Sequence, residues 1–295
     1  MIITTRLCLF ALMCSVSLPL VTSAQGLSTA PIDQALGRSG QKTGDVYKLS
    51  FPRTDLHVSV HGVAIKPGLA LGSWAAFLGT DDNAMVMGDL VLLEEEVNPV
   101  MTKLRSAGFE ITAVHNHLME ETPKVLYMHY MGHGPAAQLA SSLRAGLAVS
   151  KTPLEKPAAG AAEEAAPPEW VKAVEDAVAR KGTFKGGVLS YGVARGDTIT
   201  MAGMTIPPVA GVAEAINFQA ADSGKIATTG DFVLTAEEVN KVISDLQEHN
   251  ISVTALHSHM LTEQPRLFFM HFWSVGTPES VGDGIKAALS HVSVK

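Results

Sequence analysis

The chain contains the same group of three histidines and one glutamate twice. The spacing is identical in both groups, which are His115, His117, Glu121 and His129 and, 142 residues later, His257, His259, Glu263 and His271. Neutral imidazoles bind Zn²⁺, Cu²⁺, Ni²⁺ or Fe²⁺, and three of them leave one or two coordination positions open. A nearby carboxylate can complete the ligand set or act as a base. Each group therefore predicts a divalent transition-metal site, with Glu121 and Glu263 as candidate ligands or catalytic bases.

The secondary structure around the histidines decides whether they can meet. Residues 110–117 have strand character, and alternate residues of a strand face the same side, so His115 and His117 should share a face. The residues around position 122 have turn character, and a hairpin centred there places His129 opposite His115. We therefore expect the three imidazoles of each copy to lie within about 6 Å of one another, with the glutamate beside them.

A second interpretation needs no metal. The histidines could be hydrogen-bonded polar residues on a half-exposed sheet face, where they and aromatic neighbours such as Tyr127 and Phe269 line a pocket. The protein is then a ligand-binding or cell-envelope interaction module for a sugar or a peptide. The duplication of all four residues favours a metal site used for storage, delivery or metal-assisted hydrolysis or oxidation, because buried histidines without a metal repel one another when charged. Whether there is catalysis stays open.

The histidine groups belong to a longer internal repeat. From Met85 onward the two stretches align at the same shift of 142 residues: Gly88-Asp89 corresponds to Gly230-Asp231, and Glu95-Glu96-Val97-Asn98 corresponds to Glu237-Glu238-Val239-Asn240. A period near 140 residues is too long for a solenoid and indicates two domains or two halves of one domain. We predict an α+β fold in which two tandem copies of one α+β unit form a pseudo-dimer.

A linker separates the two copies. Residues 151–167 are rich in Ala, Pro and Glu and show no apolar periodicity, which is typical of an interdomain linker. The first repeat should therefore span residues 25–150 and the second residues 168–295. Within each repeat we expect early strands, a segment of small residues, a strand ending near Leu92 or Leu234, a helix, the histidine hairpin and a closing helix.

Residues 1–24 have the pattern of a signal peptide. Arg6 precedes an apolar run over residues 7–21, and small residues that a signal peptidase accepts end at Ala24. Both cysteines of the chain lie in this segment, so the mature protein should be cysteine-free, without disulfides. No later segment is long and apolar enough for a transmembrane helix. We expect a periplasmic or secreted protein.

Charge limits the possible partners. The formal net charge is −7, and Lys and Arg form no cluster, which argues against nucleic acid as a partner. The expected partner is a metal ion or a small molecule, and the oligomeric state stays open. Two further residue pairs repeat between the copies. Arg53 and Arg195 are expected to form salt bridges, and Asp89 and Asp231 are expected to be turn formers, with a hydrogen bond to a histidine as the alternative.

Several of these segments together resemble one known family. They are Gly88–Leu92, Glu95–Pro99, the segment from Ala113 through His115-Asn116-His117 to Glu121, and Tyr127–His129. In both halves the chain is similar to the LppY/LpqO family of exported proteins of unknown function. The resemblance implies export and an internal repeat, but it implies no reaction.

Overall fold

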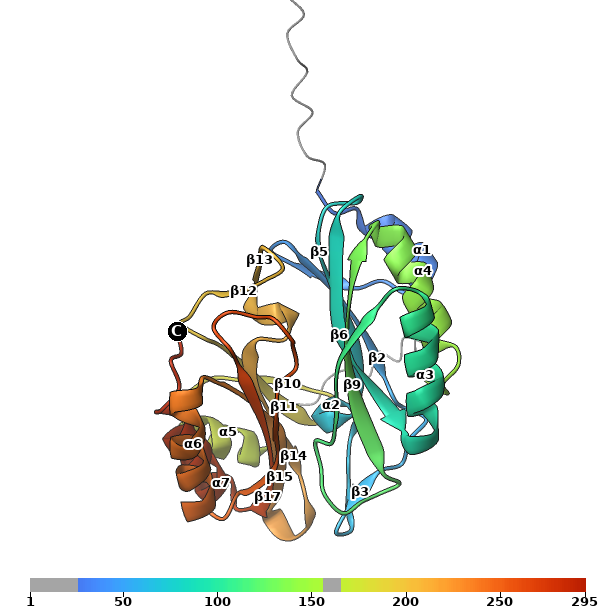
Figure 1. Cartoon of the computed structure of the whole chain (residues 1–295). Helices are drawn as coiled ribbons and strands as arrows, with labels where there is room; N and C mark the ends of the chain where they lie inside the picture. The colour runs from blue at the N-terminus through green and yellow to red at the C-terminus, as the bar shows by residue number, and fades with distance from the viewer. Residues whose placement is uncertain (1–25, 156–165) are drawn as a thin grey trace, which may run out of the picture.

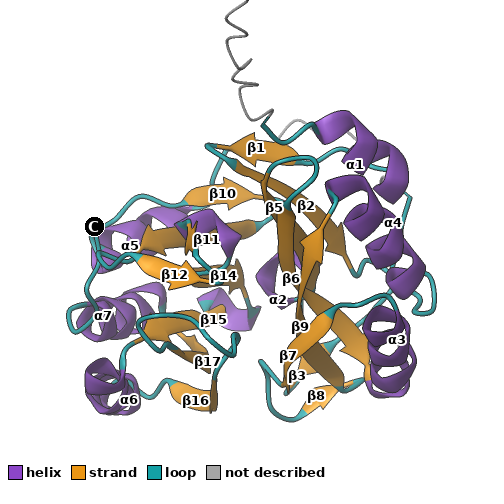
Figure 2. Cartoon of the chain, turned by 45° about the horizontal axis from the view of Figure 1, so that its top comes forward, coloured by secondary structure: helices purple, strands orange, loops and turns teal. Residues whose placement is uncertain are grey.

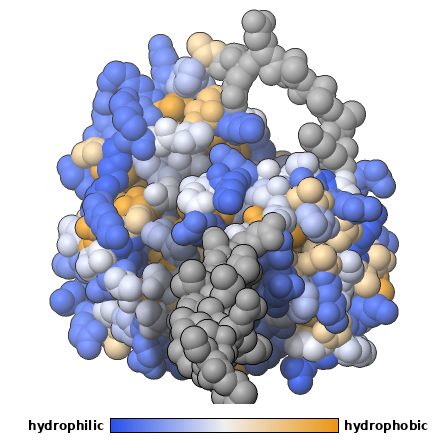
Figure 3. All heavy atoms as spheres, turned by 90° about the horizontal axis from the view of Figure 1, so that it is seen from above, coloured by the Kyte–Doolittle hydropathy of each residue, from blue (hydrophilic) through white to orange (hydrophobic). Residues whose placement is uncertain are grey.

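The computed structural model describes residues 26–155 and 166–295, to which all structural statements refer. The predicted signal peptide and most of the predicted linker lie outside the described residues, so export stays a prediction. Among the described helices, none combines the length and the apolar composition that a membrane span needs. Hydrophilic residues cover much of the face seen from above, with smaller hydrophobic patches between them (Figure 3).

Each half of the chain forms one six-stranded antiparallel sheet. The first sheet consists, in spatial order, of β1 (Gln41–Thr43), β2 (Val46–Pro52), β5 (Gly72–Gly79), β6 (Ala84–Leu93), β9 (Val125–Gly134) and β7 (Glu110–His115). The second consists of β10 (Thr183–Lys185), β11 (Val188–Ala194), β14 (Ala213–Ala220), β15 (Ile226–Leu234), β17 (Phe268–Gly276) and β16 (Ser252–His257). The strand order is the same in both, which confirms two tandem copies of one α+β unit.

Helices cover the outer face of each sheet, and the inner faces of the two sheets lie toward each other (Figure 1 and Figure 2). The first half has α1 (Thr29–Leu36), α3 (Glu94–Ser106) and α4 (Ala136–Leu147), and the second has α5 (Glu169–Val178), α6 (Ala236–Glu248) and α7 (Pro278–Leu289). Each helix buries an apolar stripe; in α5 the stripe is Val171, Val174 and Val178. Between the sheets, Met85 and Met131 of one half share a hydrophobic cluster with Phe269 of the other. The two copies therefore form the predicted pseudo-dimer.

Short elements complete each half. They are β3 (Ser59–Val60), β4 (Val63–Ala64), α2 (Pro67–Ala70) and β8 (Glu121–Thr122) in the first, and β12 (Ile199–Met201), β13 (Met204–Ile206) and the 3₁₀ helices η1 (Pro208–Ala210) and η2 (Asp222–Gly224) in the second. α2 and η1 occupy corresponding positions, directly before β5 and β14. α2 borders the smaller of the two cavities described below, and η1 borders the larger one.

The segment of small residues in each copy is a central strand, which the sequence pattern did not predict. Strand β5 pairs with β2 on one side and β6 on the other, and β14 pairs with β11 and β15 in the same way. Ala75 and Ala76 in β5 are both completely buried. In β5, small side chains fit because the strand is covered on both faces, by helices outside and by the other half inside, so the alternation typical of a half-exposed strand is lost. Strand β14 keeps the alternation, with Ile216 and Phe218 buried and Ala215 exposed.

The predicted histidine hairpin is present with a shifted register. Strand β7 pairs antiparallel with β9, and its register places His115 opposite Tyr127 and Ala113 opposite His129. The hairpin is therefore centred one residue earlier than expected, and β7 has an irregularity between Ile111 and Ala113. Diagonal neighbours on one face of a sheet still lie within reach of large side chains. His129 thus faces the same side as His115 without lying directly opposite it.

A buried arginine ties the sheet to the helix in each half. Arg53 has no exposed side-chain surface; its guanidinium donates to the Val91 carbonyl at 2.7 Å and pairs with Glu96 at 2.7 Å and Asp55 at 2.9 Å. Arg195 repeats this with Glu238 at 2.8 Å. The predicted salt bridges are confirmed, and they connect the end of β2 or β11 with the start of α3 or α6.

Candidate metal centre

All six histidines of the two groups meet in one cluster between the halves. Each stacks on a histidine of the other half, with ring centroids 3.7 Å apart in the three pairs His115–His257, His117–His271 and His129–His259. The ring of His115 lies 5.1 Å from that of His117 and 5.1 Å from that of His129. The predicted grouping within a copy is therefore present, but the two expected sites are joined into one composite cluster.

The histidines come from corresponding elements of the two sheets. His115 and His257 end β7 and β16, His129 and His271 lie in β9 and β17, and His117 and His259 lie in the loops between. The loop after β7 is hydrogen-bonded to the other half. The hydroxyl of Thr254 in β16 donates to the His117 carbonyl at 2.6 Å, and the Asn116 amide donates to the Thr254 carbonyl at 3.1 Å.

Aromatic rings support the outer histidines. The His117 ring stacks on Tyr127 at 3.4 Å between centroids, and the His259 ring stacks on Phe269 at 3.6 Å. Tyr127 and Phe269 occupy equivalent positions in the two copies, so the wall is the same in both halves. The aromatic neighbours expected from the sequence therefore hold the imidazoles in place.

The carboxylates that lie against the histidines are Asp89 and Asp231. They lie in β6 and β15, directly opposite His129 and His271 in the register. One oxygen of Asp89 is 3.8 Å from Nε2 of His117, and the other is 3.8 Å from Nε2 of His129. Asp231 lies 3.8 Å from Nε2 of His259 and 3.7 Å from Nδ1 of His271. These distances are too long for direct hydrogen bonds and leave space for a bridging atom.

Glu121 and Glu263 have a different role from the ligand or base role that their spacing predicted. An oxygen of Glu121 accepts a hydrogen bond from the Val125 amide at 3.4 Å, and Glu263 accepts one from the Leu267 amide at 3.0 Å. Both carboxylates therefore bind the backbone within the histidine hairpins, and neither belongs to a group of converging ligand atoms. The sequence signal for the aspartates was the repeated Gly-Asp pair, Gly88-Asp89 and Gly230-Asp231.

Two overlapping groups of ligand atoms could hold a metal ion. One contains His115, His257, His259 and His271, and the other contains Asp89, His115 and His129; within each group the ligand atoms lie within 4.8 Å of one another. The first group draws on both halves of the chain. No single copy could therefore supply the four-histidine set.

The ring nitrogens of this cluster have unused hydrogen-bonding capacity. Among the described residues, no hydrogen-bond partner exists for Nε2 of His115, His117, His129, His257, His259 and His271, and all these atoms are buried. Nδ1 of His271 lies 2.9 Å from the Gly230 carbonyl, so it carries the proton and leaves the Nε2 lone pair free. Buried polar atoms normally have partners, so six unpartnered nitrogens in one place call for an explanation.

Burial keeps the imidazoles neutral. It lowers the pKa of His115 to about 3, with a further contribution from His257, and it lowers the pKa of His257 to about 4. The pKa values of the other four histidines are also lowered by burial first and by neighbouring imidazoles second. Burial raises the pKa of Asp89 to about 7, against the opposing effect of Lys48. At neutral pH the cluster therefore offers lone pairs rather than positive charges.

These shifts predict how the stability of the metal-free protein depends on pH. The histidine pKa values are lower in the folded state than the value of about 6.5 in the unfolded chain, so the unfolded chain takes up protons first as the pH falls. Asp89 and Asp231 oppose this because their pKa values are raised, but six histidines outnumber them. The urea concentration at the midpoint of unfolding should therefore decrease as the pH is lowered from about 7 to about 5. A constant midpoint would mean that the histidines titrate normally in the folded state.

Fold and site together define a duplicated α+β protein with a histidine cluster on its pseudo-twofold axis. Residues 30–149 and 172–291 each match the family described as Domain of Unknown Function (DUF1259). The two matches cover most of the chain, so the protein belongs to this family and contains its domain twice. No curated protein matches the sequence.

Solved structures show only a weak likeness. A trimeric bacterial microcompartment shell protein, PduB, is 11% identical with a TM-score of 0.20, over 86% of this chain and 89% of that one. EtuB from Clostridium kluyveri is 8% identical with a TM-score of 0.20, over 85% and 90%. Crystal form III of TP0453 is 11% identical with a TM-score of 0.18, over 86% and 97%. At these TM-scores the likenesses carry no argument about function.

Proposed function

We propose that this protein binds a transition-metal ion at the composite cluster, with His115, His257, His259 and His271 as ligands. One observation carries the proposal: four neutral imidazoles from both halves bring buried ligand atoms within 4.8 Å of one another, and their Nε2 atoms have no partner in the described chain. An all-imidazole ligand set suits zinc, copper, nickel or iron. Storage, delivery and metal-assisted hydrolysis or oxidation all begin with this binding step.

The geometry favours one ion per chain. The second group of ligands, Asp89, His115 and His129, shares His115 with the first. A neutral imidazole has one free lone pair and so binds one ion. The four-histidine group is the larger ligand set and can complete a tetrahedral site alone. Asp89 and Asp231 then lie beside the ligands, where they can orient a histidine or bind a water molecule.

The decisive experiment is metal reconstitution of the mature chain without a histidine tag. After removal of metal with a chelator, titration with Co²⁺ followed by elemental analysis should give one equivalent per chain, with a visible absorption band from the coordinated ion. Two equivalents would contradict the composite centre. No bound metal, and no gain in thermal stability, would favour the alternative of a non-metal ligand-binding or cell-envelope interaction module for a sugar or a peptide.

A further inference from the structure

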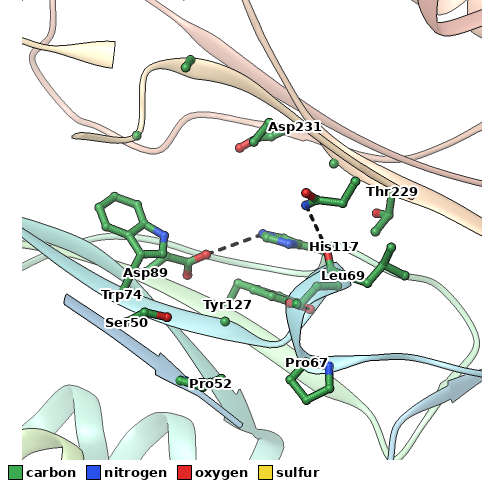
Figure 4. Close-up of a pocket in the computed structure, with 18 of the residues that line it drawn as sticks. Ser50, Pro52, Pro67, Leu69, Trp74, Asp89, His117, Tyr127, Thr229 and Asp231 are labelled. Carbon is green, nitrogen blue, oxygen red and sulfur yellow. Dashed lines mark hydrogen bonds and ion pairs between the residues drawn. The ribbon is translucent and has the colours of Figure 1, made fainter. Parts of the chain in front are cut away.

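A cavity of about 350 Å³ lies against the histidine cluster and draws its walls from both halves. Figure 4 shows Asp89, His117, Tyr127 and Trp74 on one side and Asp231 and Thr229 on the facing side. A second cavity of about 1020 Å³ shares Lys48 and Trp74 with the first and extends to the exposed Lys185. A small molecule can therefore reach the cluster from the surface through this larger cavity. The volume of the smaller cavity, about 350 Å³, is in the range of small-molecule sites.

The cavity breaks the symmetry of the duplicated fold. Strand β2 places Lys48 opposite Ala76 of β5, and β11 places Ser190 opposite Asn217 of β14, so Ser190 takes the place of Lys48 in the second half. By the same registers, Trp74 lies opposite Ser50, and Ala215 lies opposite Gly192, the equivalent of Ser50 in the second copy. Ala215 therefore takes the place of Trp74. The histidine cluster is nearly symmetric, but only the first half supplies a cation and an indole to the smaller cavity. Trp74 packs against the hydrophobic cluster between the halves, and Lys48 bonds to the Val209 carbonyl of the other half. Both also face the cavity, where the second half offers no equivalent group.

Lys48 is an incompletely paired cation. Its ammonium group donates to the Val209 carbonyl at 3.1 Å and lies 4.1 Å from the centre of the Trp74 ring. It interacts electrostatically with Asp89 but forms no ion pair within 4.0 Å with any described residue, and no other Lys or Arg of the described chain lines the smaller cavity. A partly buried ammonium group gains most from a negatively charged partner. The remaining donor capacity of Lys48 is available to a ligand inside the cavity.

The walls favour an organic anion over an inorganic one. Pro52, Pro67, Leu69 and Trp74 give the cavity an apolar side. A single lysine matches one negative charge, whereas a phosphate dianion normally needs several donors. The larger cavity adds Arg38 and Lys185 against one carboxylate, Glu214, which is buried and bonded to the Val233 amide. The approach is therefore positive overall, which attracts anions.

We propose that the smaller cavity, beside the histidine cluster, binds a small organic carboxylate. The charged end of this ligand pairs with Lys48, and its apolar body packs on Trp74. The inference deepens the proposed function and rests on it, because a metal ion at the cluster supplies the positive charge that offsets Asp89 and Asp231. The carboxylate would then lie between the metal centre and Lys48. It is the substrate or effector of the metal site.

The test compares benzoate with its neutral isostere benzamide on the Co²⁺-loaded chain, followed by calorimetry and by the Co²⁺ absorption band. Benzoate should bind and benzamide should not. Replacing Lys48 with methionine keeps the apolar stem and removes the charge, so Lys48→Met should weaken benzoate binding about tenfold or more while Co²⁺ affinity is unchanged. Lys48→Arg should retain binding. Lys42→Met, at an exposed lysine of β1, is the control and should leave both affinities unchanged.

The outcomes separate the two proposals. If the wild-type chain binds Co²⁺ but binds neither probe, or if Lys48→Met binds benzoate like the wild type, the carboxylate site is overturned and the metal centre stands. If Co²⁺ does not bind at all, the proposed function fails. In that case, benzoate is titrated into the metal-free protein and monitored by tryptophan fluorescence. This titration tests whether Lys48 binds the carboxylate without a metal ion. The comparison of benzoate with benzamide in the wild type needs no variant, so it decides even if a Lys48 variant does not fold.

Discussion

Replacing His115 with alanine should abolish metal binding by the whole chain instead of halving it. His115 belongs to both groups of ligand atoms, and it stacks on His257 at 3.7 Å in the middle of the cluster. Changes beside a metal ligand already reduce affinity roughly 10- to 100-fold, so loss of a shared ligand should exceed about 100-fold. Titration with Co²⁺ and elemental analysis measure both affinity and stoichiometry.

Two matched variants sharpen this prediction. His257→Ala removes the equivalent residue of the second copy and should have the same effect as His115→Ala. His133→Ala is the control, because His133 is exposed and has no histidine equivalent in the second copy. If His115→Ala still binds half the metal of the wild type, each copy has its own site and the composite centre is wrong.

Replacing Arg53 with leucine should destabilise the protein by about 3–5 kcal/mol, because it leaves a buried carboxylate without its partner. The Arg53 side chain is completely buried, and the Glu96 side chain with which it pairs at 2.7 Å is only 6% exposed. Leucine also leaves the Val91 carbonyl without the hydrogen bond that Arg53 donates. The free energy of unfolding from urea titration at pH 7 measures the loss.

The second copy provides an internal repetition of this experiment. Arg195→Leu should cost a similar amount, since Arg195 pairs with Glu238 at 2.8 Å and is 2% exposed. Arg180→Leu is the control, because Arg180 is exposed and makes no side-chain ion pair with the described residues. A loss below about 1 kcal/mol for both Arg53→Leu and Arg195→Leu, as for a surface pair, would mean that water solvates Glu96 and Glu238 in the folded state.

The architecture was largely predictable because the chain can be compared with itself. The match between the two copies predicted the tandem α+β units, and helical periodicity predicted α3 and α6 close to their observed positions. The hairpin that carries His115 and His129 followed from alternation and turn residues, with an error of one residue in its centre. Strand β5 was missed, because Gly72–Gly79 is rich in small residues and buried on both faces. Local patterns report a strand well only when one face is exposed.

The sequence by itself determined that His115 and His129, and likewise His257 and His271, would share a sheet face, since neighbours within one sheet follow from spacing. The expected strand over residues 110–117 ends at His115, so the loop conformation and not strand alternation places His117, and the same holds for His259. Only the tertiary structure decided that the six histidines form one cluster, because no spacing along the chain describes how two sheets face each other. Strand pairing within each sheet brought Asp89 and Asp231 to the histidines from β6 and β15, while Glu121 and Glu263 bind backbone amides. The packing of the two sheets also joined Lys48 and Trp74 of one copy with Asn217 of the other around a single cavity. A contact between the copies depends on how the inner faces of the two sheets fit together, and that fit exists only once both halves have folded.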